Sequence, residues 1–321
     1  MNSPCASISV VIPVYNSEKS LPFLIDALEK VLPQISTDFE VILVDDFSLD
    51  KSWNVICELV RHKEWIQGIK LTRNFGQHNA LLCGIRLAQK DIIITMDDDL
   101  QNPPEEIPVL LQKLWEGYDV VYGTPKQEKH GFWRNLASQA TKIVLQNAMG
   151  VDTARHVSGF RAIRSHVTNS FSDFQGPNSS IDVMLTWGTS SFSTVNVRQE
   201  PRQFGKSNYG FRRLMAHAIN MVIGFSTLPL KLASFIGFGF TMFGIVILVY
   251  VVGRYLLFGS PVQGFTFLAS TIAVFSGAQL FALGIIGEYL ARMYLRSMGQ
   301  PSYQILTRAL YDCSPSNMRP S

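Results

Sequence analysis

Two long stretches without a charged residue lie in the last third of the chain and restrict its fold more than any other feature. They run from Leu232 to Gly253 and from Gly264 to Gly287. Each is longer than the ~20 apolar residues that a helix needs to cross a bilayer. Between them, Gly259, Ser260 and Pro261 predict a tight turn. We therefore expect two transmembrane helices that form a hairpin, with both outer ends on the same side of the membrane.

The distribution of basic residues gives this hairpin an orientation. Its connecting loop contains only Arg254, whereas six basic residues flank its outer ends: Lys206, Arg212, Arg213, Lys231, Arg292 and Arg296. Lysine and arginine are enriched on the cytoplasmic side of membrane proteins. The sequence thus predicts a multi-pass protein of the cytoplasmic (inner) membrane, with both termini in the cytoplasm.

The segment that precedes the hairpin mixes basic and apolar residues. Residues 207–226 contain the adjacent Arg212 and Arg213 together with phenylalanine, leucine, methionine and isoleucine. This pattern is typical of a helix that lies in the membrane interface, although a surface helix packed on a soluble domain is the alternative. We expect a domain over residues 1–206, an interfacial helix over 207–227, two transmembrane helices within 228–290, and a cytoplasmic tail over 291–321 that is loosely ordered from Thr307 onward.

The composition excludes some functions. A formal net charge of +3 is too small to indicate nucleic-acid binding, and the 47% hydrophobic and 17% charged residues favour a protein with a membrane part. The cysteines Cys5, Cys57, Cys83 and Cys313 have no metal-site or disulfide spacing. We expect them to be reduced thiols.

Short apolar runs alternate with segments of helical apolar spacing in the first part of the chain. The expected strands are Ser7–Val14, Phe39–Val44, Ile66–Leu71, Ile92–Met96 and Tyr118–Tyr122, and the expected helices are Leu21–Leu32, Lys51–Arg61, Asn79–Leu87 and Glu105–Trp115. This alternation is typical of a parallel sheet with crossover helices. The sequence therefore predicts an α/β domain.

Three consecutive carboxylates, Asp97, Asp98 and Asp99, follow the apolar run Ile92–Met96. Ligands of open α/β sheets bind at the carboxyl ends of the strands, so this position favours a site over a solvated acidic turn. Carboxylates so close together repel one another unless a cation neutralises them, and oxygen ligands suit Mg²⁺ or Mn²⁺. The sequence contains neither a G-x-G-x-x-G nor a Walker pattern. We therefore expect a metal, not a glycine-rich loop, to hold any nucleotide phosphates.

Six stretches carry a resemblance that covers nearly the whole chain, from about residue 8 to about residue 305: Val10–Pro22, Leu43–Ser52, Arg73–Leu81, Met96–Pro108, Val157–Arg164 and Gly287–Tyr294. With the two apolar spans, they resemble family 2 glycosyltransferases, in particular the polyprenyl-phosphate glycosyltransferases such as undecaprenyl-phosphate aminoarabinose and glucose transferases and dolichyl-phosphate mannose synthases. The resemblance implies the GT-A fold, a Rossmann-like α/β domain with a mostly parallel sheet, followed by the hairpin.

The resemblance also implies where a nucleotide-diphosphate sugar, with UDP as the expected carrier, would bind. It places Pro13, Tyr15, Asn16 and Glu18 around the base and ribose, and Asp45 and Asp46 as acceptors of hydrogen bonds from the base or ribose. An alternative for Asp45 and Asp46 is that they cap the helix expected over residues 51–61. Asp97, Asp99 and Gln101 match the metal-binding positions, for Mg²⁺ or Mn²⁺. Asp98 stands where relatives have a small or neutral residue, and adds negative charge.

The implied acceptor is the phosphate of a polyprenyl phosphate at the lipid bilayer. A phosphate monoester is mostly dianionic at neutral pH and is already a nucleophile, so it requires cations more than a general base. The candidates are Arg134, Arg161 and Arg202, with Lys126 and Lys129 secondary, and Ser158 matches a phosphate-contacting serine of the mannose synthases. The expected reaction is a direct transfer of one sugar that inverts the anomeric carbon.

Two features leave the sugar open, and two alternative functions remain. The stretch Val157–Phe160 lacks an acidic residue that many relatives have, and residues 205–208 read Gly-Lys-Ser-Asn where relatives have Gly-Glu-Ser-Lys. The alternatives are a processive polysaccharide synthase, which would need a Q-x-x-R-W stretch and more spans, and a catalytically silent nucleotide-sugar-binding protein. We also expect a homo-oligomer, because Gly237, Gly239 and Gly244 allow close helix packing.

Overall fold

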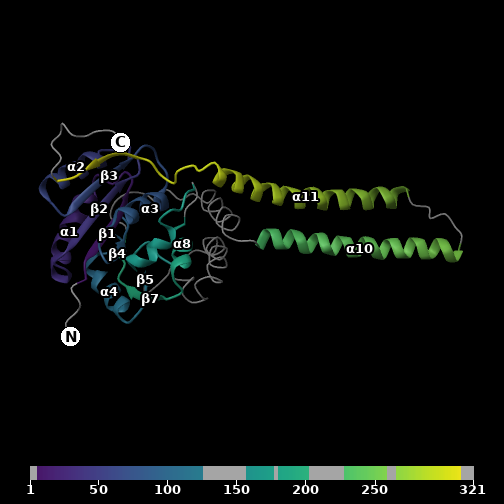
Figure 1. Cartoon of the computed structure of the whole chain (residues 1–321), viewed down its shortest axis with the longest axis horizontal. Coiled ribbons are helices and arrows are strands. Elements are labelled where there is room, and N and C mark those ends of the chain that lie inside the picture. Colours follow the sequence, from purple (N-terminus) through teal and green to yellow (C-terminus); the bar gives the residue numbers. More distant parts are fainter. Residues whose placement is uncertain (1–5, 126–156, 177–179, 202–227, 259–264, 312–321) are drawn as a thin grey trace. The chain divides into compact units, whose positions relative to one another are not determined.

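The computed structural model describes residues 6–125, 157–176, 180–201, 228–258 and 265–311. The chain divides into two compact units, residues 1–211 together with 299–321, and residues 212–298. The first unit is an α/β domain, and the second contains two long helices (Figure 1). In the chain, the two helices are therefore inserted between two segments of the α/β domain.

The described part of the α/β domain contains one sheet of eight strands. Their order in space is β7 (Phe192–Val197), β5 (Val120–Pro125), β6 (Arg161–Arg164), β4 (Ile92–Thr95), β1 (Ile8–Val14), β2 (Phe39–Asp45), β3 (Ile66–Leu71) and β8 (Ile305–Ala309). The neighbours β4, β1, β2 and β3 are parallel, and so are β5 and β7. The prediction of a mostly parallel α/β sheet is confirmed.

Two strands run in the opposite direction, and the sequence did not predict them. Strand β6 pairs antiparallel with β4 and β5, and β8 pairs antiparallel with β3. The expectation that the tail is loosely ordered from Thr307 onward is therefore wrong as far as Ala309, because Ile305–Ala309 form β8. Ala309 lies in the core beside Gly68 of β3. A Cβ added to Gly68 would lie 3.3 Å from the Cβ of Ala309. The small apolar Ala309 thus anchors β8 at the edge of the sheet.

Helices cover both faces of the sheet (Figure 1). In the α/β domain these are α1 (Leu21–Ile35), α2 (Ser52–His62), α3 (Gln77–Leu87), η1 (Pro104–Glu106), α4 (Ile107–Trp115), α7 (Ser165–Thr168), η2 (Asn169–Phe171) and α8 (Ile181–Gly188). Helices α1, α2 and α4 share one core cluster with Val10 and Ile12 of β1. Helix α3 packs on the opposite face, where a Cβ at Gly84 would lie 2.3 Å from Val11. Because side chains alternate along a strand, β1 presents apolar side chains to both faces, and all of its residues, Ser9 included, are buried.

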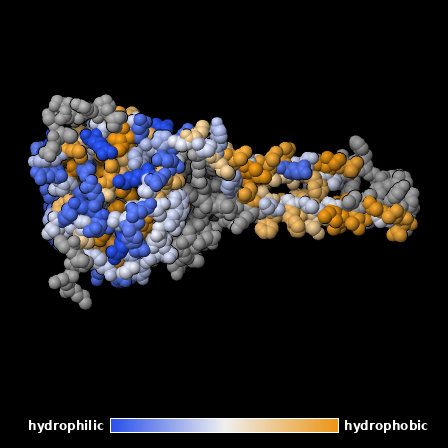
Figure 2. Space-filling view, in the orientation of Figure 1, coloured by the Kyte–Doolittle hydropathy of each residue, from blue (hydrophilic) through white to orange (hydrophobic). Residues whose placement is uncertain are grey.

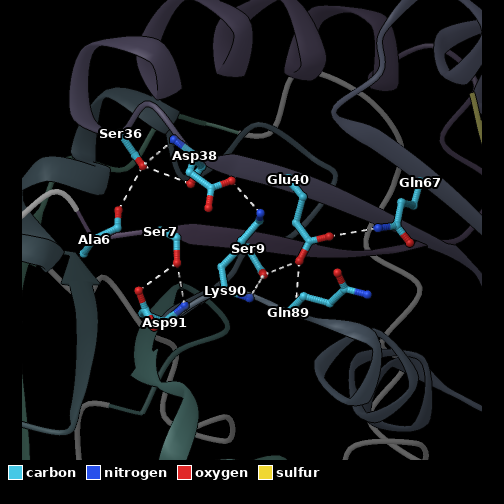
Figure 3. Close-up of polar contacts among 10 residues, drawn as sticks. All are labelled: Ala6, Ser7, Ser9, Ser36, Asp38, Glu40, Gln67, Gln89, Lys90 and Asp91. Atoms are coloured by element: carbon cyan, nitrogen blue, oxygen red, sulfur yellow. Dashed lines mark hydrogen bonds and ion pairs between the residues drawn. The ribbon is translucent and has the colours of Figure 1, made fainter.

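Polar side chains at the amino ends of the central strands satisfy one another (Figure 3). Glu40 is buried, and its two oxygens accept hydrogen bonds from Ser9 Oγ (2.6 Å), Gln67 Nε2 (2.8 Å) and the backbone N of Gln89 (2.8 Å). A buried carboxylate with these partners avoids the cost of an unsatisfied polar group. The amino ends of the central strands therefore need no ligand, and the candidate site lies at their carboxyl ends.

The second unit consists of α10 (Leu228–Phe258) and α11 (Phe265–Ser297), which lie side by side and run in opposite directions (Figure 1). The rings of Phe240 and Phe275 meet edge to face with centroids 5.7 Å apart. A Cβ at Gly244 would lie 3.0 Å from the Phe275 ring, so this glycine permits the close approach. Figure 2 shows hydrophobic side chains along the exposed surfaces of both helices.

The apolar content of these helices bears on the predicted membrane spans. Residues Ala233–Arg254 of α10 form a helix with a mean hydropathy of 2.4 that is long enough to cross a membrane. Among the described residues of α11, the apolar stretch is the shorter Phe275–Ala291. The described part of α10 is thus long and apolar enough for the first span, and both spans stay predictions. The interfacial helix expected over residues 207–227 lies outside the described residues.

Candidate active site

The loops that follow β1 and β2 are joined by hydrogen bonds between side chains and backbone. Asn16 Oδ1 accepts a hydrogen bond from the backbone N of Leu49 (2.8 Å). Glu18 Oε2 accepts one from the backbone N of Lys51 (3.0 Å), and the backbone N of Glu18 donates to Asp50 Oδ2 (3.1 Å). Asn16 and Glu18, both expected at the nucleotide pocket, therefore use these side-chain oxygens to fix two loops at the carboxyl edge of the sheet.

The hydrogen bonds of Asp50 contradict the alternative interpretation that Asp45 and Asp46 cap α2. Its Oδ1 accepts hydrogen bonds from both the backbone N (2.9 Å) and Oγ (2.6 Å) of Ser52, the first residue of α2. The side chains of Asp45 and Asp46 point elsewhere in the site. The capping interpretation is therefore wrong, and the carboxylate that binds the first backbone N of α2 is that of Asp50.

Asp45 and Asp46 are both buried, but their surroundings differ. Asp46 accepts hydrogen bonds from the backbone N of Phe75 (2.7 Å) and of Gly76 (2.8 Å), one on each oxygen. Asp45 Oδ1 accepts one from the backbone N of Ser48 (3.1 Å), while its Oδ2 is buried with no hydrogen-bond partner among the described residues. Burial raises the pKa of both carboxyls, that of Asp46 to about 6. Asp46 thus holds the start of α3 in place, and Asp45 Oδ2 is left to accept a hydrogen bond from a ligand.

The raised pKa of Asp46 predicts a pH-dependent stability. Between about pH 4 and pH 6 the folded chain binds a proton at Asp46 that the unfolded chain, with the ordinary pKa of 3.8, has released. The contribution of Asp46 to stability therefore decreases as the pH rises through this window, by about 1–3 kcal/mol. We expect the melting temperature of the wild type, relative to Asp46→Asn, to decrease between pH 4 and pH 6.5 and then to level off.

An exposed aspartate provides the control for this measurement. Asp26 lies exposed on α1, so the difference between wild type and Asp26→Asn should change little over the same pH range. A flat Asp46→Asn difference would mean that Asp46 is ionised throughout and that its two backbone hydrogen bonds outweigh its burial.

The middle carboxylate of the acidic triplet joins the loop after β4 to the loop after β1. Asp98 Oδ2 accepts hydrogen bonds from the backbone N of Tyr15 (3.2 Å) and from Ser17 Oγ. Burial raises the pKa of Asp98 to about 6, and the adjacent charge of Asp99 acts in the same direction. The extra acid expected at this position is therefore directed at the β1 loop. The ring of Tyr15 is exposed beside it.

The outer two carboxylates have different partners. Asp97 Oδ1 accepts a hydrogen bond from Gln77 Nε2 (2.6 Å), and Asp99 Oδ1 accepts one from the backbone N of Gln101 (3.1 Å). A Cβ added to Gly159 would lie 3.1 Å from Asp97 Oδ2, so a side chain at position 159 would crowd this carboxylate. Among the described residues no group of three or more His, Cys, Asp or Glu could hold a metal ion.

The expected ligand set nevertheless fits a divalent cation. It consists of two carboxylates and the carboxamide of Gln101, so it does not require a third acid. Oxygen donors are those that Mg²⁺ and Mn²⁺ prefer, and a partial protein set leaves coordination positions for phosphate oxygens.

Backbone strain is concentrated in the same loops. Within the described residues, the non-glycine residues with positive φ are Asn16 (56°), Phe47 (61°) and Leu100 (60°). They follow β1, β2 and β4 respectively. Left-handed backbone is costly for a bulky side chain such as phenylalanine and is often found at functional sites. Its position here supports placing the site at the carboxyl ends of these three strands.

The structure corrects the role expected for Arg161. Its guanidinium is only 2% exposed and forms an ion pair with Asp182 of α8. Its Nε donates to Thr95 Oγ1 (2.9 Å), and the Tyr122 ring lies beneath it with the centroid 5.8 Å from Cζ. A guanidinium that is buried and paired in this way does not reach the phosphate of a lipid. Arg161 is therefore part of the interior of the domain.

The remaining predicted residues differ in how much the structure says of them. Pro13 is buried within β1, opposite Val44 of β2. Ser158 is half-buried, and its Oγ accepts a hydrogen bond from the backbone N of Phe160 (3.2 Å). Arg134, Arg202, Lys126 and Lys129 lie outside the described residues.

Three residues at the site were not predicted. Gln77 contacts Asp97, Thr95 contacts Arg161, and Asp182 pairs with Arg161. Gln77 lies in the stretch Arg73–Leu81 that carried the resemblance, so a signal was present. Asp182 offered a weaker one, a single acid at the start of the apolar run 181–185. Thr95 offered none, because threonine is an ordinary strand residue.

A mostly parallel α/β sheet with carboxylates at the carboxyl ends of β2 and β4 is the GT-A arrangement of glycosyltransferases. A family model described as glycosyl transferase family 2 matches residues 9–175. The chain belongs to this family, and the predicted resemblance is confirmed. It is a glycosyltransferase.

Curated relatives match over almost the full length. The undecaprenyl-phosphate 4-deoxy-4-formamido-L-arabinose transferase of Pectobacterium carotovorum subsp. carotovorum is 33% identical over 300 residues, which are 92% of this chain and 92% of the relative. The enzyme of the same name from Yersinia pestis is 34% identical over 307 residues, 94% of each chain.

Solved structures share the fold of the domain. Glucosyl-3-phosphoglycerate synthase from Mycobacterium tuberculosis, crystallised with Mn²⁺, UDP-glucose and phosphoglyceric acid, aligns with a TM-score of 0.51 and 19% identity, over 68% of this chain and 78% of that one. Mannosyl-3-phosphoglycerate synthase from Rubrobacter xylanophilus aligns with a TM-score of 0.51 and 16% identity, over 68% of this chain and 72% of that one.

Proposed function

We propose that this chain transfers a single sugar from a nucleotide-diphosphate sugar, with UDP as the carrier, to the phosphate of undecaprenyl phosphate or a related polyprenyl phosphate. The observation that carries the proposal is the similarity of 33–34% over more than nine-tenths of both chains to transferases named for undecaprenyl phosphate. The carboxylates at the ends of β2 and β4 support it, because such a donor needs both hydrogen-bond acceptors and a cation site.

Asp97, Asp99 and Gln101 would hold the divalent cation, Mg²⁺ or Mn²⁺. When bound, the cation neutralises the developing negative charge of the leaving nucleotide diphosphate. The Mn²⁺ in the complex of the structurally similar glucosyl-3-phosphoglycerate synthase supports a cation of this kind. Gln77 keeps Asp97 in place from the side of α3 through its hydrogen bond to Oδ1.

The nucleoside of the donor would bind against the joined loops of β1 and β2. The buried Asp45 Oδ2 accepts a hydrogen bond from an N–H of the base or an O–H of the ribose, which satisfies an oxygen that otherwise has no partner among the described residues. Tyr15, whose ring is exposed, follows Val14, the residue of β1 that pairs with Asp45 of β2, and its backbone N is held by Asp98. Asp46, Asn16 and Glu18 act by fixing the loops.

The acceptor phosphate is itself the nucleophile. It attacks the anomeric carbon directly, the bond to the nucleotide diphosphate breaks on the opposite side, and the configuration inverts. A phosphate monoester is mostly dianionic at neutral pH, so no residue needs to remove a proton from it. Cations that hold it against the charge of the donor are required, and these would be Arg134 and Arg202, with Lys126 and Lys129. The neutral hydroxyl of Ser158 would contact the phosphate.

The two helices α10 and α11 would form the transmembrane hairpin, with the catalytic domain and both termini on the cytoplasmic side of the inner membrane. The apolar stretch Ala233–Arg254 and the exposed apolar side chains of both helices support this. Gly244 packs against Phe275 within the hairpin, whereas no atom would lie within 4 Å of a Cβ at Gly237 or Gly239. These two glycines are where copies would pack in a homo-oligomer.

A transfer assay with membranes tests the proposal. Membranes that contain the full chain are incubated with a panel of labelled UDP-sugars, Mn²⁺, and either undecaprenyl phosphate or undecaprenol. We expect label in the lipid extract with one donor, dependent on the phosphate of the acceptor. The anomeric configuration of the product, determined by NMR spectroscopy, should be opposite to that of the donor.

Other outcomes would reject the proposal in distinct ways. Label in a long water-soluble polymer would indicate a processive synthase. Binding of a UDP-sugar without transfer under any condition of the panel would indicate a silent binding protein. Equal transfer to undecaprenol would mean that a hydroxyl, not a phosphate, is the nucleophile.

A further inference from the structure

Gly159 lies unusually close to one of the acids of the proposed cation site. A Cβ at this position would lie 3.1 Å from Asp97 Oδ2 and 3.2 Å from Asp97 Oδ1. These distances are tighter than ordinary van der Waals contact with carbon. The Asp97 carboxylate therefore occupies space that any side chain at position 159 would need, and the position of the Gly159 backbone decides how much of that space is open.

Thr95, the last residue of β4, holds the backbone of Gly159 in place. Its Oγ1 donates a hydrogen bond to the carbonyl oxygen of Gly159 (2.7 Å) and accepts one from Arg161 Nε (2.9 Å). The side chain is fully buried, so water does not replace either partner. Because Arg161 can only donate, it forces the hydroxyl hydrogen of Thr95 toward Gly159.

Arg161 is itself fixed from the far side. Its guanidinium pairs with Asp182 of α8, and Tyr122 OH donates to the same carboxylate oxygen of Asp182 (3.2 Å). All of these side chains are buried. A buried ion pair adds little stability compared with apolar side chains of similar size, and its better-supported use is to specify one arrangement. The arrangement specified here ends at the Thr95 hydroxyl and the backbone of Gly159.

We propose that Thr95, oriented by the Arg161–Asp182 pair, is a positioning residue that holds the backbone of Gly159 beside Asp97, and so sets the space in which this carboxylate is oriented for a divalent cation. This inference rests on the proposed function, since it needs the cation site at Asp97 and Asp99. Residues that orient a metal ligand typically change the affinity for the metal by about 10–100-fold when they are replaced.

Direct titration of Mn²⁺ tests this role. The purified full chain, with UDP present, is titrated with Mn²⁺ while the free ion is measured by EPR spectroscopy. Thr95→Val keeps the shape of the side chain but removes the hydroxyl, and we expect about 10-fold weaker binding of Mn²⁺. Thr95→Ser keeps the hydroxyl and should bind Mn²⁺ within about 2-fold of the wild type.

A second threonine supplies a matched control. Thr168 Oγ1 also donates to a backbone carbonyl, that of Ser165 (2.7 Å), but it follows β6 at the opposite edge of the sheet. Thr168→Val should therefore leave the affinity for Mn²⁺ unchanged. Gly159→Ala is a second route to the same effect, because its Cβ would displace Asp97, and we expect at least a 10-fold loss with Thr95 intact.

The results separate this inference from the proposed function. If the wild type and Asp97→Asn bind Mn²⁺ equally poorly, the cation site fails and the inference fails with it. If the wild type binds Mn²⁺ through Asp97 but Thr95→Val and Gly159→Ala bind it equally well, the positioning role is rejected and the proposed function stands. Thermal unfolding of each variant identifies any loss that is due to unfolding, and Gly159→Ala then decides where Thr95→Val does not fold.

Discussion

Asp97→Asn is expected to slow sugar transfer to the lipid by about 10²–10³-fold, and Asp99→Asn to do the same. Each change replaces a carboxylate with a neutral amide of the same shape, so one unit of negative charge is lost from the proposed cation site. Charge stabilisation by a bound metal is worth several kcal/mol in a transition state. Each 1.36 kcal/mol corresponds to a tenfold change in rate. Initial rates at saturating donor and acceptor, measured over a range of Mn²⁺ concentrations, give the effect.

The neighbouring Asp98 shows whether the loss comes from specific metal ligands or from removing any negative charge of the triplet. Asp98 directs its Oδ2 to Tyr15 and Ser17, and an asparagine there keeps an oxygen that accepts these hydrogen bonds. Asp98→Asn should therefore change the rate by less than about 10-fold and leave its dependence on Mn²⁺ as in the wild type. Asp26→Asn, on the exposed face of α1, should have no effect. Full activity of Asp97→Asn or Asp99→Asn, or an equal loss in Asp98→Asn, would reject the assigned metal ligands.

The central strands could be predicted because their apolar runs are continuous and end in charged or polar residues. Strands β1, β2, β3 and β4 and helices α1 to α4 all lie where hydrophobic spacing placed them, within a few residues at the ends. Parallel strands buried on both faces leave this strong signal. The acidic triplet could be located for the same reason, since it follows directly from where the fourth run ends.

The antiparallel strands and the buried ion pair could not be predicted in this way. Strand β6 has only four residues and carries an arginine at each end, so it shows no apolar run. Strand β8 follows the two long helices, and its pairing with β3 depends on contacts far away in the chain. Local patterns do not contain such pairings.

Arg161 shows the same limit for a functional residue. The sequence gives an arginine in a stretch that resembles phosphate-binding relatives, and an exposed arginine is the usual case. Its burial depends on Asp182, 21 positions later, which brings a carboxylate to it from α8. Likewise, Asp46 and Asp98 were identified as site residues, but which of their oxygens bind backbone could only be learned from the folded loops.

The second large effect is expected in stability. Asp182→Ala would leave the guanidinium of Arg161 buried without a counter-charge, because the ion pair is 2% and 8% exposed at its two side chains. Breaking a buried pair from one side typically costs about 3–5 kcal/mol. Tyr122 OH would lose its acceptor at the same time. For a domain of this size the melting temperature should decrease by roughly 6–20 °C.

Three variants test this origin of the loss. Asp182→Asn keeps an oxygen that accepts from Arg161 and Tyr122, so its loss should be intermediate, and Tyr122→Phe should cost about 1 kcal/mol. Asp38→Ala breaks the ion pair of Lys90 and Asp38, whose carboxylate is 62% exposed, and should cost at most about 1 kcal/mol. If Asp182→Ala costs no more than Asp38→Ala, the guanidinium of Arg161 finds solvent easily. Arg161 would then again be available to a phosphate, and the proposed route from Asp182 through Thr95 to Asp97 would lose its fixed starting point.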